Sequence, residues 1–477
     1  MTQTVSLEPE DEFDLHIGPI RKRIGGDEIP MLAYNGSVPG PTLRVRQGSE
    51  VTVHVTNDSD ADTTVHWHGL RLENRFDGVP GQTQPPIPPG GTFAYRLRFG
   101  DPGLYWYHPH LREDYGQEMG LYAPIVVEPA NAAYWPPVDR DLTITLDDVL
   151  LEDGQMVPFD RSGPNFAAMG RFGNVLLTNG ETTFTARAAV GEVVRLYLVN
   201  TANTRIFRVA LPGARMKLVG SDSGRYEQEA FVSSVLLAPS ERAVVDVRFD
   251  SPGQVGLEHR TPERVYELGS FSVAGAAASF ASFESLRTDP ELTEIRRGLG
   301  PQLEREPDKT LTFVAEMPGM HHHHHHHDHD AGDGIEWEDT MPEMNRASDP
   351  SNTVWKLVDA DTGAENHQIA WTFTAGDTVK IRLVNTRESD HPMHHPFHVH
   401  GAGRFLVLAR DGVIEPNLAW KDTVLLRTGE TVDILLHVTN PGRWMAHCHI
   451  AEHHESGMMF SFDVRGASFS EVPRPAR

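Results

Sequence analysis

The chain has 477 residues, of which 39% are hydrophobic and 23% are charged, and this is enough apolar material for two or three globular domains. The formal net charge of −25 argues against nucleic acid and anionic membrane surfaces as partners, and fits cations or neutral aromatic molecules better. No run of residues reaches the length of a membrane span.

The N-terminal residues MTQTVSLEPEDEFDL lack the basic start and the apolar stretch of a secretion signal. This predicts a cytoplasmic protein, or a periplasmic or secreted one if a leader has been trimmed. The single cysteine, Cys448, excludes a disulfide within the chain, so cysteine pairing carries no information about the compartment.

One strand pattern occurs three times: GSEVTVHVTND from Gly48, GEVVRLYLVNT from Gly191 and GDTVKIRLVNT from Gly376. Each copy has a turn glycine, an acidic residue and alternating apolar residues that end in Asn, which is typical of a β-strand. Because the copies lie more than 100 residues apart, they indicate duplicated domains and not a solenoid. The prediction is an all-β protein of Greek-key β-sandwich domains.

A second pattern lies near the end of each predicted domain: DPGLYWYHPH from Asp101, SPGQVGLEHR from Ser251 and NPGRWMAHCH from Asn440. The first and third copies have histidines at matching positions, where the middle copy has Glu258 and Arg260. In the same way VHWHG and FHVHG contain paired histidines, whereas the middle domain has FRVAL. This predicts a metal site between the first and last domains, with the middle domain as a spacer that holds no ligand.

The domain limits follow from these patterns. We expect domains at residues 1–130, 131–290 and 305–477, with a linker around residues 274–307 and a His-rich loop at residues 317–344 in the third domain.

Four His-x-His pairs stand out: His66/His68, His108/His110, His398/His400 and His447/His449. Residues i and i+2 of a strand face the same side, so each pair presents two imidazoles roughly 7 Å apart at the backbone. A single such pair is usually two surface histidines. Four pairs at matching places in two repeats predict convergent imidazoles, which suit Cu, or less well Zn.

Cys448 lies between His447 and His449 and must therefore face the opposite side of the strand. His453 and Met458 follow, and His395 precedes His398 by an odd offset that also directs it to the other side. Two His, one Cys and a weak Met are the ligands of a blue copper site. An electron on Cys448 would have a covalent route to the histidine cluster through either neighbour.

The motifs HWHG, YHPH, HPFHVHG and HCHIAEHHESGM resemble the four copper motifs of the multicopper oxidases, specifically the three-domain bacterial laccases and cuprous oxidases. The likeness extends along the whole chain and includes YNGSVPGPTLRVRQG from Tyr34. All twelve ligand positions that the family uses are filled.

This resemblance implies three cupredoxin-like Greek-key β-sandwich domains in one chain and four copper ions. It implies a type 1 copper on His395, Cys448, His453 and axial Met458, and a type 2 copper on His66 and His398. It implies two type 3 coppers, one on His68, His108 and His449 and the other on His110, His400 and His447. The family reaction is four one-electron oxidations at type 1 copper, followed by reduction of O2 to water.

Oxygen reduction also needs protons. Asp77, in RFDGVPG, matches an acidic position that family members use near type 2 copper, although it can also be read as a turn residue before Gly78. Many bacterial relatives have Glu directly after the second type 1 His, where this chain has His454. Glu452 and Glu455 flank that place without occupying it, and His454 itself could titrate in the required range.

The histidine run at residues 321–327, continued as DHD, has a metal-binding composition and is flanked by MPGM (Met317, Met320) and MPEM (Met341, Met344). Thioethers favour Cu(I) and imidazoles bind Cu(II), so one hypothesis is a loop that collects copper near the type 1 site. The alternative is two methionine pairs in strands or turns beside a solvated histidine tail.

The leading prediction is an oxidase of phenols and similar aromatics that uses dioxygen. The alternatives are a metal oxidase that converts Cu(I) to Cu(II), or a copper store without turnover. A store has no need for a Cys448 site coupled to a trinuclear one, and a copper nitrite reductase is excluded because that group lacks the four His-x-His pairs. Three complete domains in one chain also predict a monomer.

Overall fold

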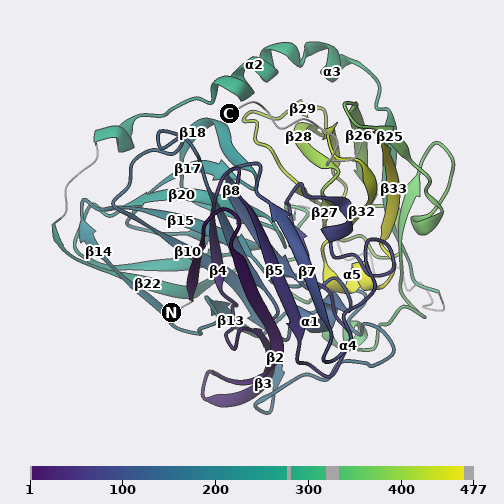
Figure 1. Cartoon of the computed structure of the whole chain (residues 1–477), viewed down its shortest axis with the longest axis horizontal. Coiled ribbons are helices and arrows are strands. Elements are labelled where there is room, and N and C mark those ends of the chain that lie inside the picture. The colour runs from purple at the N-terminus through teal and green to yellow at the C-terminus, as the bar shows by residue number, and fades with distance from the viewer. Residues whose placement is uncertain (1–2, 277–280, 319–331, 467–477) are drawn as a thin grey trace.

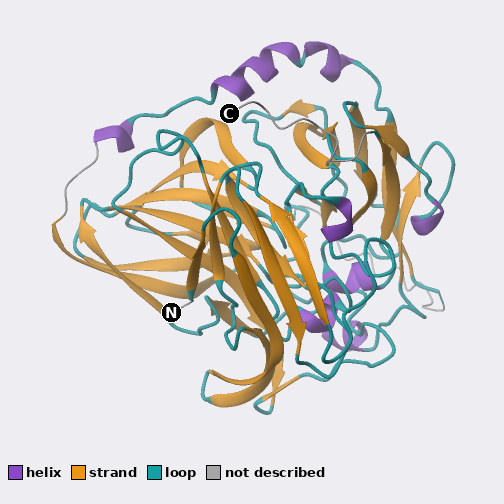
Figure 2. Ribbon diagram, viewed as in Figure 1, coloured by secondary structure: helices purple, strands orange, loops and turns teal. Residues whose placement is uncertain are grey.

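The computed structural model describes residues 3–276, 281–318 and 332–466. Strands are the main regular secondary structure in this part of the chain and the helices in it are short (Figure 2), which confirms the predicted all-β class. The α-helices are α1 (Glu113–Gly116), α2 (Pro290–Gly298), α3 (Gly300–Glu304), α4 (Pro342–Arg346) and α5 (Ala451–Glu455), and the 3-10 helices are η1 (Asn74–Phe76), η2 (Ala281–Glu284) and η3 (Asn366–Gln368).

The first pair of sheets comes from the N-terminal third of the chain. One sheet contains, in spatial order, β1 (Thr4–Leu7), β4 (Thr42–Arg46), β9 (Ala123–Glu128), β8 (Gly103–His108) and β6 (His66–His68). The other contains β3 (Asp27–Tyr34), β2 (Glu12–Ile24), β5 (Glu50–Asn57) and β7 (Thr92–Arg98).

The second pair of sheets comes from the middle of the chain, with a small hairpin, β11 (Leu151–Glu152) and β12 (Gln155–Met156), beside it. One sheet contains β13 (Val175–Thr178), β10 (Arg140–Val149), β15 (Val193–Asn200), β20 (Arg242–Arg248), β17 (Arg215–Ser221) and β18 (Gly224–Val232). The other contains β14 (Phe184–Val190), β22 (Val265–Ala276), β21 (Gly253–Arg260), β16 (Phe207–Ala210) and β19 (Val235–Leu237).

The third pair of sheets comes from the C-terminal third. One contains β24 (Val354–Asp359), β23 (Lys309–Glu316), β26 (Thr378–Asn385), β31 (Thr431–Val438), β28 (Gly403–Arg410) and β29 (Val413–Ile414). The other contains β25 (Thr372–Thr374), β33 (Met459–Arg465), β32 (Gly442–Cys448), β27 (His395–Val399) and β30 (Thr423–Leu426). We propose that these three pairs of sheets are the three domains, with the limits expected from the sequence.

The strand repeated three times in the sequence forms β5, β15 and β26. Its terminal residue, Asn57, Asn200 or Asn385, is buried in all three copies. Each of these side-chain amides donates hydrogen bonds to loop carbonyls, for example from Asn57 to Ile87 and from Asn385 to Met393. The repeated Asn therefore holds neighbouring loops in place, because the amide supplies donors that buried loop carbonyls need.

The first and last pairs of sheets share one continuous hydrophobic core, whereas the middle pair has its own. A third cluster, which includes Trp106 and Tyr197, joins the first pair to the middle pair. Strand β15 is buried along its whole length because its two faces belong to different clusters. Figure 1 shows the consequence: the strands of the first third, in purple, lie between the teal middle strands and the green to yellow strands of the last third.

The predicted linker contains two helices, α2 and α3, along one edge of the molecule (Figure 1). Asp289 accepts a hydrogen bond from the Leu292 amide and Pro290 occupies the first turn, so the sequence carries a good helix start there. Leu292 and Leu299 pack against Leu406 and Trp420 of the last third. The connection is therefore held on the third pair of sheets. In the described part of the chain, no helix is both long and apolar enough to cross a membrane.

Candidate metal centre

The histidine-bearing strands pair within each end of the chain. In the N-terminal sheet, His66 of β6 lies directly opposite His108 of β8. In the C-terminal sheet, His398 of β27 lies opposite His447 of β32. These four residues lie at or near the ends of short buried strands. The second histidine of each His-x-His motif therefore falls at the strand end or just beyond it.

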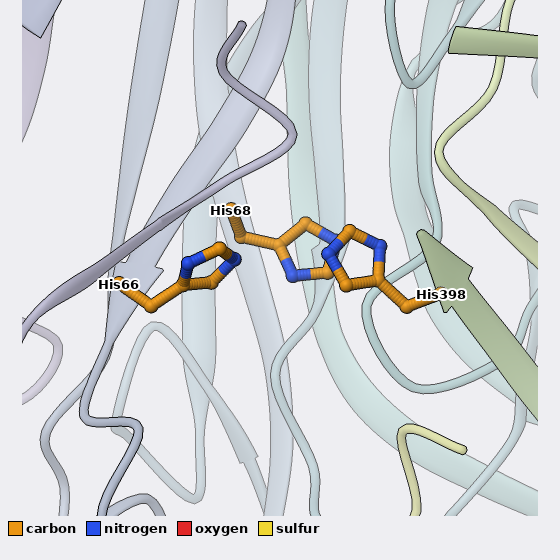
Figure 3. Close-up of side chains that lie close together, drawn as sticks. All are labelled: His66, His68 and His398. Atoms are coloured by element: carbon orange, nitrogen blue, oxygen red, sulfur yellow. The ribbon is translucent and has the colours of Figure 1, made fainter. Parts of the chain in front are cut away.

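The eight paired histidines converge between the first and last thirds of the chain. All eight side chains are almost completely buried. Figure 3 shows the rings of His66 and His68 directed towards that of His398, which comes from a strand on the opposite side. The rings form three groups, and within each group one nitrogen of every ring lies within 4.8 Å of the others. The groups are His66/His68/His398, His68/His108/His449 and His110/His400/His447.

Hydrogen bonds to backbone carbonyls define the free nitrogen of several of these rings. His66 Nδ1 donates to the Asp77 carbonyl at 2.7 Å, His108 Nδ1 to the Pro109 carbonyl at 2.9 Å, and His398 Nδ1 to the Asp422 carbonyl at 2.9 Å. Carbonyls only accept, so Nδ1 carries the hydrogen and Nε2 keeps its lone pair. Nε2 of all three rings is buried without a hydrogen-bond partner.

In the third group the Nε2 atoms face one another. His400 Nε2 lies 3.2 Å from His110 Nε2 and 3.0 Å from His447 Nε2. Burial, followed by repulsion between the rings, lowers the pKa of His110 and His400 well below the usual value, so these imidazoles are neutral. Convergent ring nitrogens that keep their lone pairs are the donor set that a cluster of copper ions requires.

Asp77 connects the two ends of the chain at this cluster. It is 1% exposed, accepts from His66 through its carbonyl and accepts from His400 Nδ1 at 2.8 Å through Oδ2. The loop can approach β6 because Gly78 has φ +84°, and a Cβ there would lie 2.0 Å from the Val65 carbonyl oxygen. Asp77 is thus more than a turn residue, although its acidic role stays a prediction.

Cys448 lies on the other side of β32, with His395 and His453. Its Sγ is 3.5 Å from His395 Nδ1 and 3.8 Å from His453 Nδ1. All three side chains are at most 1% exposed. Met458 is also buried, and its carbonyl accepts from the Cys448 amide at 3.1 Å. The residues predicted as type 1 ligands are therefore neighbours, and their binding of copper stays a prediction.

The Cys448 group is covered by aromatic rings and by a loop of the middle third. Trp355 stacks on His453 with ring centroids 3.9 Å apart. His453 Nε2 donates to the Ala168 carbonyl at 3.3 Å. The loop that carries Ala168 is held by α4 and its flank, because its amides donate to Ser348 and Asn345 and its Gly170 carbonyl accepts from Asn345. This loop over His453 could not be predicted from the sequence, because residues 157–173 carry no motif.

His454 does not titrate in the range that the sequence suggested. Burial lowers its pKa to about 3, since the ring is enclosed beside His447 and His110. Glu113 of α1, which was not predicted, lies here: its Oε2 is 3.2 Å from His454 Nδ1 and its Oε1 is 3.4 Å from His110 Nε2. Its signal in the sequence is a Glu three residues after the second His motif.

The two flanking carboxylates face away from the histidines. Glu452 accepts from Asn203 and Thr204 of the middle third, and Glu455 accepts from the Glu113 amide. Burial, with Asp114 nearby, raises the pKa of Glu452 to about 7 and that of Glu455 to about 8. The acidic side chains of Glu113, Asp114, Glu452 and Glu455 therefore form one cluster beside the histidines.

The methionine pairs beside the histidine run are only partly described. Met317 is 7% exposed, and Met341 packs against the core that the first and last pairs of sheets share. These two positions fit the structural alternative for the methionines. The histidine run itself, residues 321–327 with His329, and Met320 lie outside the described residues.

Comparisons with known proteins agree with this geometry. Two family models, each described as multicopper oxidase, match residues 20–132 and 336–468. The chain is 28% identical over 508 residues to "Multicopper oxidase MmcO" of Mycobacterium tuberculosis, covering 97% of this chain and 87% of that protein. It is 27% identical over 499 residues to "Laccase-1" of Botryotinia fuckeliana, covering 97% and 83%. The crystal structure of a multi-copper oxidase from Pseudomonas thermotolerans has a TM-score of 0.71 and 27% identity, covering 98% of this chain and 100% of that one.

Proposed function

Because this chain belongs to the multicopper oxidase family and is a copper-dependent oxidoreductase that uses dioxygen, we propose that its reductants are phenols and similar electron-rich aromatic molecules. The observation that most supports copper-dependent oxidation is the position of Cys448. It faces His395 and His453 on one side of β32, while its two neighbours in the chain face the eight-histidine cluster on the other.

We propose four copper ions on the ligand set expected from the resemblance, with type 1 copper on His395, Cys448, His453 and Met458, type 2 on His66 and His398, and type 3 on His68, His108 and His449 and on His110, His400 and His447. When bound, these ions supply one-electron oxidation at the mononuclear site and four-electron reduction of O2 to water at the cluster. The buried lone pairs described above support this set, and one chain holds all of it, which supports a monomer.

The chain itself provides two short electron paths from Cys448 to the cluster. Both run through the backbone to the adjacent histidines. One is reinforced because His447 Nδ1 donates to the Cys448 carbonyl at 2.8 Å, while His447 Nε2 points into the cluster. This hydrogen bond fixes the ring that receives the electron.

Two buried carboxylates, Asp77 and Glu113, lie beside the cluster. Asp77 Oδ2 is bonded to His400, and its Oδ1 has no hydrogen-bond partner. Glu113 lies between His110 and His454 on the other side. We propose that Asp77 supplies protons for oxygen reduction, and that Glu113 takes the place of the Glu that many bacterial relatives have at position 454.

A reductant has room to bind near the Cys448 group. A cavity of about 1050 Å³ is lined by residues 332–340 and by residues 261–264 of the middle third. In its wall, the Glu336 amide donates to His394, the chain neighbour of His395. Trp337 is among the residues that line this cavity, and an aromatic side chain there suits a neutral aromatic molecule.

A second candidate is a cuprous oxidase, favoured by the histidine run and the adjacent methionines. The test is oxygen uptake by the fully copper-loaded protein with a methoxyphenol and, separately, with Cu(I). We expect phenol turnover without added copper. Fast Cu(I) oxidation combined with phenol turnover only in excess copper would favour the cuprous oxidase. Copper binding without oxygen uptake from either reductant would instead indicate a store.

Deleting residues 321–329 tests the histidine run separately. If the run collects copper, the deletion should slow Cu(I) oxidation at low copper concentration and leave phenol oxidation unchanged. The rate is measured as oxygen uptake at limiting Cu(I), with a chain of equal length in which the run is replaced by Gly and Ser as control. An unchanged rate at low copper would rule out this role.

A further inference from the structure

His68 uses its two ring nitrogens in the opposite way to His66, His108 and His398. Its Nε2 donates to Asp422 Oδ1 at 3.1 Å and lies 3.2 Å from Thr423 Oγ1. Its Nδ1 is buried without a partner, whereas His66, His108 and His398 leave Nε2 free. His68 therefore presents the opposite nitrogen to the cluster, and something outside the cluster must hold the ring in this orientation.

Asp422, immediately before β30, holds two of the cluster histidines. Its carboxylate accepts from His68 of the first domain, and its carbonyl accepts from His398 Nδ1 of the third domain at 2.9 Å. The side chain is only 4% exposed. The position of Asp422 therefore determines the orientation of both rings. A carboxylate that is buried in this way needs a cationic partner.

That partner is Arg242, the first residue of β20 in the middle domain. Its Nη1 and Nη2 donate to the two Asp422 oxygens at 2.6 and 2.5 Å. The remaining donors are also used, because Nε donates to the Leu104 carbonyl of the first domain and Nη1 to the Ser240 carbonyl. The guanidinium is fully buried. One planar group therefore fixes atoms from all three pairs of sheets, which the flexible ammonium of Lys could not do.

Gly69, the glycine of HWHG, leaves the space for this pair. Its φ is +85°, and a Cβ there would lie 2.5 Å from Asp422 Oδ2 and 2.9 Å from Arg242 Nη2. The position directly after His68 therefore requires glycine, because a side chain there would clash with the ion pair that orients His68.

Lys421 forms a contact between the second and third domains that does not involve the cluster histidines. Its Nζ is 3.1 Å from both Asp222 and Glu241 of the middle domain, so it too forms buried ion pairs across this boundary. No hydrogen bond described for Lys421 reaches a cluster histidine, because its side chain leaves the backbone on the opposite side from Asp422. It is a matched control for Arg242.

We propose that Arg242 is a positioning residue for the trinuclear copper site, acting through Asp422 to hold His68 with Nδ1 towards the cluster. The middle domain then contributes to the metal site without supplying a ligand, beyond the spacer role expected from the sequence. The proposal rests on the ligand set given under the proposed function.

The experiment compares the wild type with Arg242→Gln, Arg242→Lys and Lys421→Met. Copper is titrated into each apoprotein, and the type 2 EPR signal, the near-ultraviolet absorption of the type 3 pair and the blue absorption of type 1 copper are recorded. We expect Arg242→Gln to retain cluster copper about 10- to 100-fold more weakly, with altered near-ultraviolet absorption of the type 3 pair, which His68 would ligate, and unchanged blue absorption. Arg242→Lys should keep its copper and show a smaller change in the type 3 absorption.

Lys421→Met should have the spectra of the wild type even if its unfolding temperature falls. Wild-type cluster spectra and copper affinity in Arg242→Gln would overturn the proposal, and so would an equal loss in Lys421→Met. If Arg242→Gln does not fold, Arg242→Lys decides: an altered type 3 absorption supports the proposal and a wild-type absorption overturns it. A wild type without type 2 and type 3 signals would instead contradict the proposed ligand set.

Discussion

Replacing Cys448 by Ser should abolish the blue colour and reduce oxidation of any reductant to background, while the copper of the histidine cluster remains. The physical reason is that Cys448 offers the one thiol in the chain, 3.5 and 3.8 Å from the two histidines that would share its copper. A serine hydroxyl is a hard, neutral ligand that cannot replace a thiolate for copper or carry its electron transfer.

The measurement is the visible spectrum, the copper content and oxygen uptake with a methoxyphenol. Met458→Leu is the matched control, because Leu fills a similar volume in the same buried site. It should keep the blue colour and oxidise reductants at a changed type 1 potential, since the axial ligand tunes that potential. Retained phenol turnover in Cys448→Ser would contradict the assigned electron path.

Asp77→Asn should slow the reduction of oxygen by about 10²- to 10⁴-fold, the usual contribution of a positioned acid or base. The amide can still accept a hydrogen bond from His400 Nδ1, as Asp77 Oδ2 does at 2.8 Å, and the backbone bond to His66 is unaffected. The substitution therefore removes the acid and keeps the geometry. The first step, reduction of the blue centre by the reductant, should proceed at the wild-type rate.

Stopped-flow spectroscopy separates these steps, because the blue colour is lost without oxygen and returns when oxygen is added. Glu73→Gln, in the same loop but paired with Arg75 and Arg96 at the surface, should behave as the wild type. If Asp77→Asn lost its cluster copper, Asp77 would be a residue that holds the histidines in place and not a proton donor.

Local patterns in the sequence were sufficient to find the strands and the faces of the metal-binding residues. The alternation around Val51, Val53 and Val55 predicts β5, and the i, i+2 spacing of the histidines places each pair on one side of a strand. The odd spacing of Cys448 and His395 sends both to the other side, where they are found together. These conclusions need only the period of a strand.

Other features depend on contacts between residues far apart in the chain. Glu113 lies beside His454 because α1 packs against α5, and Arg242 reaches Asp422 although 180 positions separate them. The cover over His453 comes from a loop of the middle domain. Arg242 and the loop over His453 have no local sequence signature, and Glu113 has only its position three residues after His110.

The sequence by itself determined the all-β class, the threefold repeat and the clustering of copper-type ligands at its two ends, because strand periodicity and residue chemistry are local properties. The tertiary structure alone decided which nitrogen of His68 is free, that burial keeps His454 neutral, and that the middle domain reaches the site through Arg242. Ring orientation, desolvation and ion pairing depend on what the folded chain brings next to each group, and only the packed arrangement of all three domains fixes these neighbours.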